Sequence, residues 1–398
     1  MSQAHTSSAG ESKSVKRVRN AFFALVLLSA ALLIALLAAE ALVRVVRPQQ
    51  LVHHRPDVYQ PMDTVGFGHR PNVRTTINTG ERTVDLFTDR DGYRIGAGGR
   101  RDASTRVLIL GDSFMQALQV EYERSVAGRL ESELLTRTGE QVAVRNAAVS
   151  DWQPSQYLLQ LERSLASENF SLVVVGFFVS NDVVGRRVDH FDPRPYSPVQ
   201  PLRMPRGLGA GELRDAVLVP LSDYLAARSH LFVMVKKRTK TIRIMLGLSR
   251  AEVPNGLLTD FHDSPDWTVS ADICQRIADV ATASGARTVF LLIPAVEQVD
   301  RQIFEDFARA FAVDTSRIDL DQPNRILRDE LESRGLEVID LLPLMREAHG
   351  TGGRLYGRVD WHFTPRGHAI VASHLLPVAA ELLLEADSAR SAAPTNGD

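Results

Sequence analysis

Short apolar runs alternate with amphipathic stretches over most of the chain from residue 105 onwards. The apolar runs predict strands over residues 106–111, 141–149, 171–178, 287–294 and 336–341. Apolar residues at helical spacing predict helices over residues 123–139, 153–168, 271–285, 325–335 and 364–386. Apolar strands that alternate with amphipathic helices indicate βαβ units and a parallel sheet with helices on both faces. The pattern therefore predicts an α/β fold.

A longer apolar run lies near the N-terminus. Residues 21–39 carry no charge, and at about 1.5 Å per residue a helix of this length nearly crosses a bilayer. Basic residues precede the run, and Arg44 and Arg47 follow it. The preceding basic residues are Lys13, Lys16, Arg17 and Arg19. They predict a cytoplasmic tail over 1–20 and place the chain beyond about residue 45 outside the cytoplasm.

Two other interpretations of this run remain open. Ala39-Glu40-Ala41 resembles a signal-peptidase site, but the run is longer than the usual apolar region of a signal peptide, about 7–15 residues. The run could also be a buried core helix, although such helices rarely lack a polar stripe. We favour an uncleaved, single-pass transmembrane anchor over residues 21–43.

The remaining regions are less regular. Residues 45–104 alternate Thr, Val and Phe with turn residues and predict a small β-rich lead-in, with a flexible joint at 96–102. Residues 183–268 are rich in Pro and Gly and indicate an insertion over one end of the sheet, a candidate lid. The small and polar tail at 388–398 predicts disorder.

Composition and charge narrow the function. The net charge of −2 argues against nucleic-acid binding, which usually requires a basic surface. The single cysteine, Cys274, excludes an intramolecular disulfide and any cysteine-based metal cluster.

The strongest chemical signal is LILGDSFMQA at 108–117, where an apolar strand runs into Gly-Asp-Ser. A Ser113 at the carboxyl end of a parallel strand would lie where open α/β sheets bind ligands. An ordinary strand-to-helix turn explains this motif equally well when it is taken alone. Three further blocks follow in order: NAAVSDW (146–152), FFVSNDV (177–183) and VDWHFTPRGHAIVA (359–372).

Together the four blocks resemble the signature of the SGNH/GDSL hydrolases. The resemblance covers about 105–387, apart from the insertion, and the lead-in is similar to that of a membrane-anchored bacterial subgroup. It implies a three-layer, flavodoxin-like α/β/α sandwich with a five-stranded parallel sheet. It also implies a domain in the periplasm, beyond the bacterial inner membrane, and neither a metal nor an organic cofactor.

The resemblance assigns roles residue by residue. Ser113 matches the nucleophile, His362 the base and Asp360 the carboxylate that orients it. The oxyanion hole would combine the backbone N–H groups of Ser113 and Asp151 with the side-chain amide of Asn181.

The chain departs from the family pattern at three points. Asp151, or else Ser150, stands where the family usually has Gly. The Gly of the third block is also missing, and Asp360 and His362 are one residue closer than in many members. Asp112 matches the family pattern without a triad role, and His368 is the reserve candidate for the base, although a locally bonded helix residue explains it better.

Three functions fit these residues. The first is a serine esterase that removes acyl groups from a cell-envelope glycan or a small ester, with Trp152 and Trp361 as candidate sugar-stacking residues that could equally pack the core. The second is an O-acyltransferase that passes the same acyl group to an exopolysaccharide. The third is a non-catalytic glycan-binding protein on the same fold. The sequence indicates no nucleic-acid partner and leaves the oligomeric state open.

Overall fold

The computed structural model describes residues 13–51, 55–139, 141–183, 204, 209–246, 248 and 253–392. The strands in these ranges are β1 (Tyr59–Met62), β2 (Gly66–His69), β3 (Arg74–Asn78), β4 (Thr83–Thr88), β5 (Arg94–Ile95), β6 (Thr105–Gly111), β7 (Val142–Asn146), β8 (Leu172–Phe178), β9 (Arg287–Ile293) and β10 (Glu337–Asp340). The first two form an antiparallel hairpin, and the other eight form one sheet in the order β10-β9-β8-β6-β7-β5-β4-β3.

The large sheet is mixed, which corrects the expected five-stranded parallel sheet. Strands β7, β6, β8, β9 and β10 do pair in parallel, as the βαβ pattern predicts. The lead-in adds β5, β4 and β3 in antiparallel order, through the pairing of Arg94 with Asn146 at the end of β7. An uncovered β7 edge would expose unpaired backbone groups, and the lead-in strands remove that edge.

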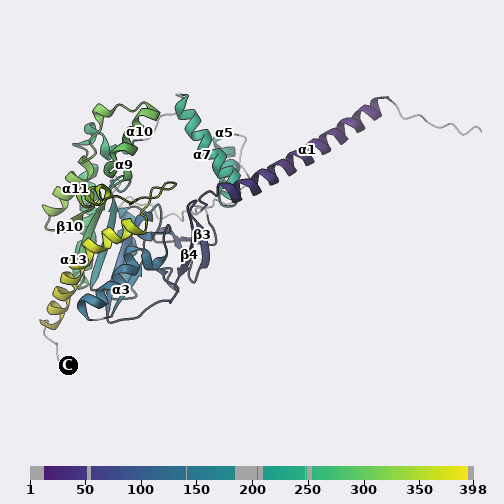
Figure 1. The fold of residues 1–398 in the computed structure, drawn as a ribbon. Coiled ribbons are helices and arrows are strands. Elements are labelled where there is room, and N and C mark those ends of the chain that lie inside the picture. The colour runs from purple at the N-terminus through teal and green to yellow at the C-terminus, as the bar shows by residue number, and fades with distance from the viewer. Residues whose placement is uncertain are drawn as a thin grey trace, which may run out of the picture.

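Helices cover both faces of the parallel strands, and Figure 1 shows α3 and α13 lying together on one of them. The helices are α1 (Lys13–Val46), α2 (Ser113–Gln116), α3 (Val126–Thr138), α4 (Pro154–Leu165), α5 (Ala210–Leu213), α6 (Val219–Ala226), α7 (His230–Met245), α8 (Asp266–Ala283), α9 (Val296–Val299), α10 (Arg301–Phe311), α11 (Gln322–Glu332), α12 (Leu341–Gly350) and α13 (Pro365–Ala392). Short helical turns are η2 (Tyr122–Arg124), η4 (Arg214–Leu218), η5 (Asn255–Leu257), η6 (Thr259–Phe261) and η7 (Thr315–Arg317).

Side chains that alternate along each parallel strand enter two separate cores. In β6, Leu108 and Leu110 pack with residues of α4, α8 and α11, whereas Val107 and Ile109 pack with residues of α3, α12 and α13. All four side chains are fully buried. The three-layer arrangement follows because a strand that is apolar on both sides needs a cover on both sides.

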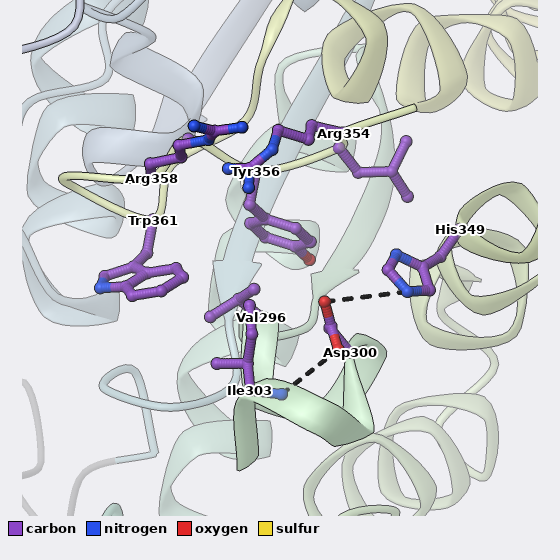
Figure 2. Close-up of a pocket in the computed structure, with 10 residues that line it drawn as sticks. Val296, Asp300, Ile303, His349, Arg354, Tyr356, Arg358 and Trp361 are labelled. Carbon is purple, nitrogen blue, oxygen red and sulfur yellow. Dashed lines mark hydrogen bonds and ion pairs between the residues drawn. The ribbon is translucent and has the colours of Figure 1, made fainter. Parts of the chain in front are cut away.

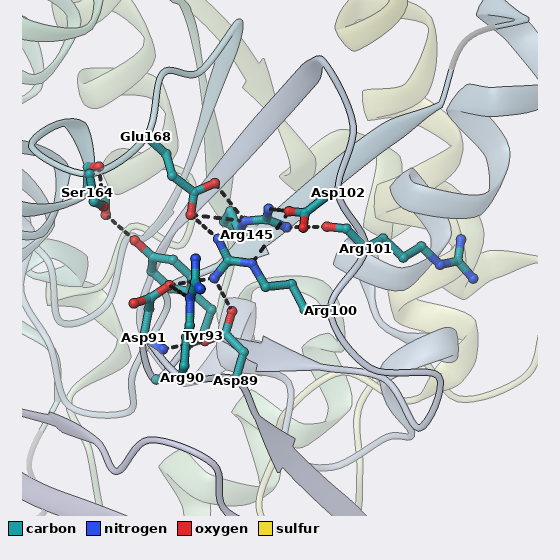
Figure 3. A network of polar contacts seen from close by, with 12 residues as sticks. Asp89, Arg90, Asp91, Tyr93, Arg100, Arg101, Asp102, Arg145, Ser164 and Glu168 are labelled. Atoms are coloured by element: carbon teal, nitrogen blue, oxygen red, sulfur yellow. Dashed lines mark hydrogen bonds and ion pairs between the residues drawn. The ribbon is translucent and has the colours of Figure 1, made fainter.

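A network of ion pairs fastens the lead-in to the main domain (Figure 3). Arg100 Nη1 lies 2.7 Å from Asp89 Oδ2, and the same guanidinium also binds Glu168. Arg145 on β7 lies 3.0 Å from Glu168 Oε2 and 2.8 Å from Asp102 Oδ1. The segment 96–102 was expected to be a flexible joint, but Arg100 and Asp102 fix it to the sheet.

Helix α1 projects away from the folded domain (Figure 1). It has 34 residues, and the stretch Arg17–Val46 is long and apolar enough to cross a membrane, with none of its most apolar window buried. Pro365–Leu384 also passes that test of length and composition, but half of its window is buried, because α13 is a core helix.

Three expected regions lie partly outside the described residues. In the insertion, α5, α6 and α7 are described, whereas 184–203, 205–208, 247 and 249–252 are not. Helix α13 continues to Ala392, so 388–392 are helical where disorder was expected, and 393–398 lie outside the described range. The cytoplasmic tail expected over 1–20 is described only from Lys13, where α1 begins.

Candidate active site

Ser113 lies at the carboxyl end of β6, in the turn that leads into α2. Gly111 makes this turn with φ of 149°, and a Cβ there would lie 3.0 Å from the carbonyl oxygen of Gly176 on the neighbouring strand. The Asp112 carboxylate accepts a 2.9 Å hydrogen bond from Phe114 N and caps the turn. These constraints leave Ser113 half-buried at the edge where the parallel strands end.

His362 comes from a loop far along the chain and meets Ser113 directly. The distance from His362 Nε2 to Ser113 Oγ is 2.7 Å. The loop is closed by a hydrogen bond from Gly357 N to His362 O, 2.8 Å long, and the imidazole packs on the ring of Phe114 at 4.8 Å between centroids. The imidazole is therefore held in reach of the hydroxyl proton.

Asp360 lies on the other side of the imidazole, at a longer distance. Its Oδ2 is 3.8 Å from His362 Nδ1, and its Oδ1 accepts a 3.3 Å hydrogen bond from the backbone N of His362. The carboxylate is nearly buried, and Gln50 Nε2 donates to it at 3.3 Å. The pairing is looser than a hydrogen bond, and proximity without a tight contact is common where no substrate is bound.

The lead-in holds the loop that carries His362, the candidate base, which the sequence did not indicate. Glu81 Oε1 accepts a 2.6 Å hydrogen bond from Val359 N and another from Arg358 N. The insertion also approaches this loop, because Lys237 on α7 is close enough to Asp360 to interact with its charge. Partial burial lowers the pKa of Lys237, and the negative charge of Asp360 opposes that shift.

Asp151 has a backbone conformation that favours glycine. Its φ is 65°, in the left-handed region that L-residues rarely occupy, although Asp tolerates it better than most. Its side chain is exposed to solvent. The backbone at Asp151 thus has the left-handed conformation that the usual Gly of the family pattern would adopt easily.

Asn181 lies next to the Ser113 turn. Burial raises the pKa of the Asp112 carboxyl to about 7, and hydrogen bonds from Phe114 N and from the Asn181 side chain oppose the shift. Burial and the nearby Asp112 also raise the pKa of Asp182, which accepts hydrogen bonds from Tyr157 Oη and Phe178 N, each at 2.9 Å. This buried acid pair anchors the turn that presents Asn181.

A second buried network supports the loop at 150–152. The Gln116 Oε1 atom accepts hydrogen bonds from Ser150 N, at 3.1 Å, and from Ser150 Oγ. The amide nitrogen of the same side chain contacts Tyr59 Oη at 3.1 Å and His69 Nε2. Tyr59 and His69 belong to the β1–β2 hairpin, so the lead-in supports both loops of the site. No sequence pattern indicated this network, because its members come from distant segments.

The two tryptophans differ in position. Trp152 is 1% exposed and donates a 3.0 Å hydrogen bond to Phe67 O, so it packs the core and cannot bind a substrate, which corrects that expectation. Trp361 is 43% exposed and lines a cavity of about 240 Å³ beside the base loop (Figure 2). His368 is 1% exposed, and burial lowers its pKa to about 3, as suits a core residue.

No group of three or more metal-ligating side chains is found within the described part of the chain. The site thus consists of a serine, an imidazole and a carboxylate, with backbone and amide donors nearby. These groups can perform acyl transfer through a covalent intermediate.

No protein-family model matches the chain, and the comparison with curated proteins gave no match. Solved structures do resemble it. A lipolytic protein of the G-D-S-L family from Veillonella parvula DSM 2008 is 12% identical, with a TM-score of 0.38, over 69% of this chain and 98% of that one. The acetylxylan esterase Axe2 from Geobacillus stearothermophilus, as a catalytic mutant, is 11% identical with a TM-score of 0.37, over 70% and 95%.

A further structure is LAE5, an alpha/beta hydrolase enzyme from the metagenome of Lake Arreo in Spain. It is 14% identical to this chain, with a TM-score of 0.39, over 71% of this chain and 98% of its own. The similar structures are thus lipolytic hydrolases and esterases. Their superpositions are too loose to assign an activity, so the case for the site rests on its own atoms.

Proposed function

We propose that this protein is an SGNH-type serine esterase, anchored in the bacterial inner membrane, that removes acyl groups from a cell-envelope glycan. The observation that carries the proposal is the 2.7 Å contact between Ser113 Oγ and His362 Nε2. The two residues are 249 positions apart, and each belongs to a block of the family signature. A chance contact between two surface loops would not unite a serine at a strand end with a base and a nearby carboxylate.

The chemistry is acyl transfer in two steps. Ser113 Oγ attacks the ester carbonyl, and His362 Nε2 accepts the hydroxyl proton. The tetrahedral oxyanion receives hydrogen bonds from the N–H groups of Ser113 and Asp151 and from the Asn181 amide. When the intermediate collapses, His362 gives the proton to the leaving sugar oxygen, and the acyl group stays on Ser113. Water, activated by His362, then releases the carboxylic acid and restores the serine.

Asp360 orients the imidazole and stabilises its protonated form. The bond from Gln50 and the backbone bond from His362 N fix the carboxylate on the Nδ1 side of the ring. A small movement of the loop would close the 3.8 Å separation to hydrogen-bond length when positive charge develops on the ring.

The contacts of Glu40 support an anchor that is retained rather than cleaved. Its carboxylate accepts hydrogen bonds from Ser229 Oγ at 2.7 Å, His230 N at 3.0 Å and Leu231 N at 2.9 Å, and so caps α7. Arg44 Nη2 also donates to Arg228 O at 2.9 Å. Cleavage after Ala41 would remove Glu40 and leave these N-terminal groups of α7 without their acceptor.

Turnover of p-nitrophenyl acetate by the full chain in detergent tests the proposal. We expect Ser113→Ala and His362→Ala each to lose about 10³-fold or more in kcat, because members of a triad act as a unit. Asp360→Asn should lose less than His362→Ala, since an orienting residue contributes less than the base itself. If the wild type only matches the Ser113→Ala background, the esterase proposal fails.

A further inference from the structure

The cavity beside the base loop has a composition that the esterase chemistry does not use. It lies between the loop 354–361 and the start of α9 and α10, and Figure 2 shows Tyr356 between Trp361 on one side and His349 on the other. Val296, which lines it, follows β9 at the carboxyl end, the same edge as Ser113. Because the base loop forms one wall, a ligand in this cavity would lie next to His362.

The charge of the lining is positive. Arg354 and Arg358 line the cavity, and within the described part of the chain neither guanidinium has an ion pair or a side-chain hydrogen bond. Asp300 is the acidic residue in the lining, and its carboxylate is occupied by Gln302 N at 3.0 Å and Ile303 N at 3.3 Å, with His349 Nε2 at 3.8 Å. The two guanidinium groups and the one carboxylate give the lining a net charge of +1 when the His349 imidazole is neutral.

Trp361 adds a flat apolar wall. It occupies the left-handed region with φ of 62°, a conformation that a bulky residue adopts only when its surroundings hold it there. The indole is 43% exposed and lines the cavity, so part of its surface is free to contact a ligand. Strained backbone and an exposed aromatic ring between Asp360 and His362 are features of binding sites rather than of packing.

We propose that this cavity binds an acidic sugar of the glycan, with the carboxylate of a uronic acid on Arg354 and Arg358 and the pyranose ring on Trp361. The planar guanidinium matches a carboxylate with two hydrogen bonds, and the C–H face of a pyranose is apolar enough to stack on an indole. This inference rests on the proposed function, because it requires that an acylated sugar of the same glycan lies at Ser113. The substrate class is then an O-acylated glycan that contains uronic acids.

Direct binding tests the cavity without relying on catalysis. The full chain in detergent is titrated by calorimetry with oligogalacturonate and, separately, with neutral xylotetraose, both free of acyl groups. We expect the acidic oligosaccharide to bind more tightly, and Arg354→Gln and Arg358→Gln each to weaken it about tenfold, as for the loss of one charged hydrogen bond. Arg90→Gln is the matched control, since Arg90 is 78% exposed and lies in the lead-in.

Kinetics with O-acetylated forms of the same two oligosaccharides give the second readout. The ratio of kcat/KM for the acidic over the neutral ester should fall in both cavity variants and not in Arg90→Gln. Equal binding of the two oligosaccharides, no binding of either, or an unchanged ratio in the arginine variants would overturn the inference. If Ser113-dependent turnover of p-nitrophenyl acetate persists in that case, the esterase proposal survives. If turnover is absent but arginine-dependent binding is present, the esterase proposal fails and the acidic-sugar site stands.

Discussion

At the scale of single residues, Asp151 is where this chain departs most from the family it resembles. Its backbone is already in the left-handed region, with φ of 65°, so a glycine would fit without any change of the loop. Its carboxylate, however, adds a negative charge close to where an oxyanion would form. The charge is felt nearby, since it contributes to the raised pKa values of both Asp112 and Tyr59.

Asp151→Gly should therefore raise kcat for p-nitrophenyl acetate, by about fivefold. Asp151→Asn is the matched variant, because it removes the charge and keeps the side chain. Steady-state kinetics of both variants measure the effect. A fall in kcat for Asp151→Gly would mean that the carboxylate assists the reaction and that the oxyanion hole is assigned wrongly.

The candidate site residues have local signals in the sequence, because they lie beside predicted strands or helices. Ser113 and Asn181 follow apolar runs, and Asp360 and His362 precede a helix, so each has a local signal. Gln50, Glu81 and Gln116 have none. They act by hydrogen bonds over 34 to 310 positions, and such contacts exist only once the sheet has formed.

At the scale of elements, the β1–β2 hairpin supports the loop that would form the oxyanion hole. Tyr59 and His69 contact the Gln116 amide, and Gln116 in turn holds Ser150. Trp152 and Gln156, just beyond this loop, donate to Phe67 O and Val65 O in or beside the same hairpin. The loop is therefore positioned from outside the βαβ core.

Gln116→Ala should lower kcat by about tenfold or more with little change in KM, because a misplaced oxyanion donor weakens only the transition state. Gln160→Ala is the matched control: Gln160 is also buried, but it bonds Ser164 away from the site. Both variants should lose stability, since each removes a buried hydrogen bond. Equal kcat values in the two variants would show that Gln116 has only a structural role.

The hairpin also predicts a dependence of stability on pH. Burial lowers the pKa of His69 from 6.5 to about 4, so the folded protein binds this proton less readily than the unfolded chain. The resulting stability is complete above pH 6.5 and is lost as the pH falls towards 4, up to about 3 kcal/mol. Urea unfolding at pH 7 and pH 4.5 measures it. His69→Gln should shrink the difference between the two pH values, and an unchanged difference would contradict the assignment.

At the scale of the whole molecule, the sequence predicted the parallel layers and a β-rich lead-in, but not that the lead-in strands extend the large sheet. The apolar runs are continuous and buried on both faces, so they can be recognised as strands without any tertiary information. The strands β3, β4 and β5 are short, β3 and β4 are partly exposed, and the place of all three in the large sheet depends on the free edge of β7. Helix α10 was not predicted, although Ile303, Phe307 and Phe311 recur along it at helical spacing.

The retained anchor is tested by the mass of the native protein. Because Glu40 caps α7, we expect detergent-extracted protein to keep residues 1–46 and to stay in the membrane after a high-salt wash. Intact-mass spectrometry of the extracted chain measures this. A mature N-terminus at Leu42, with the protein released into the soluble fraction, would instead identify the apolar run as a signal peptide.

The central claim is that His362 activates Ser113 as a nucleophile, and reaction with a fluorophosphonate probe tests it most directly. Peptide mass spectrometry of the full chain after labelling locates the adduct. We expect one adduct on Ser113, absent in Ser113→Ala and formed at least about 10³-fold more slowly in His362→Ala. No adduct, an adduct on another serine, or labelling that does not depend on His362 would contradict the account.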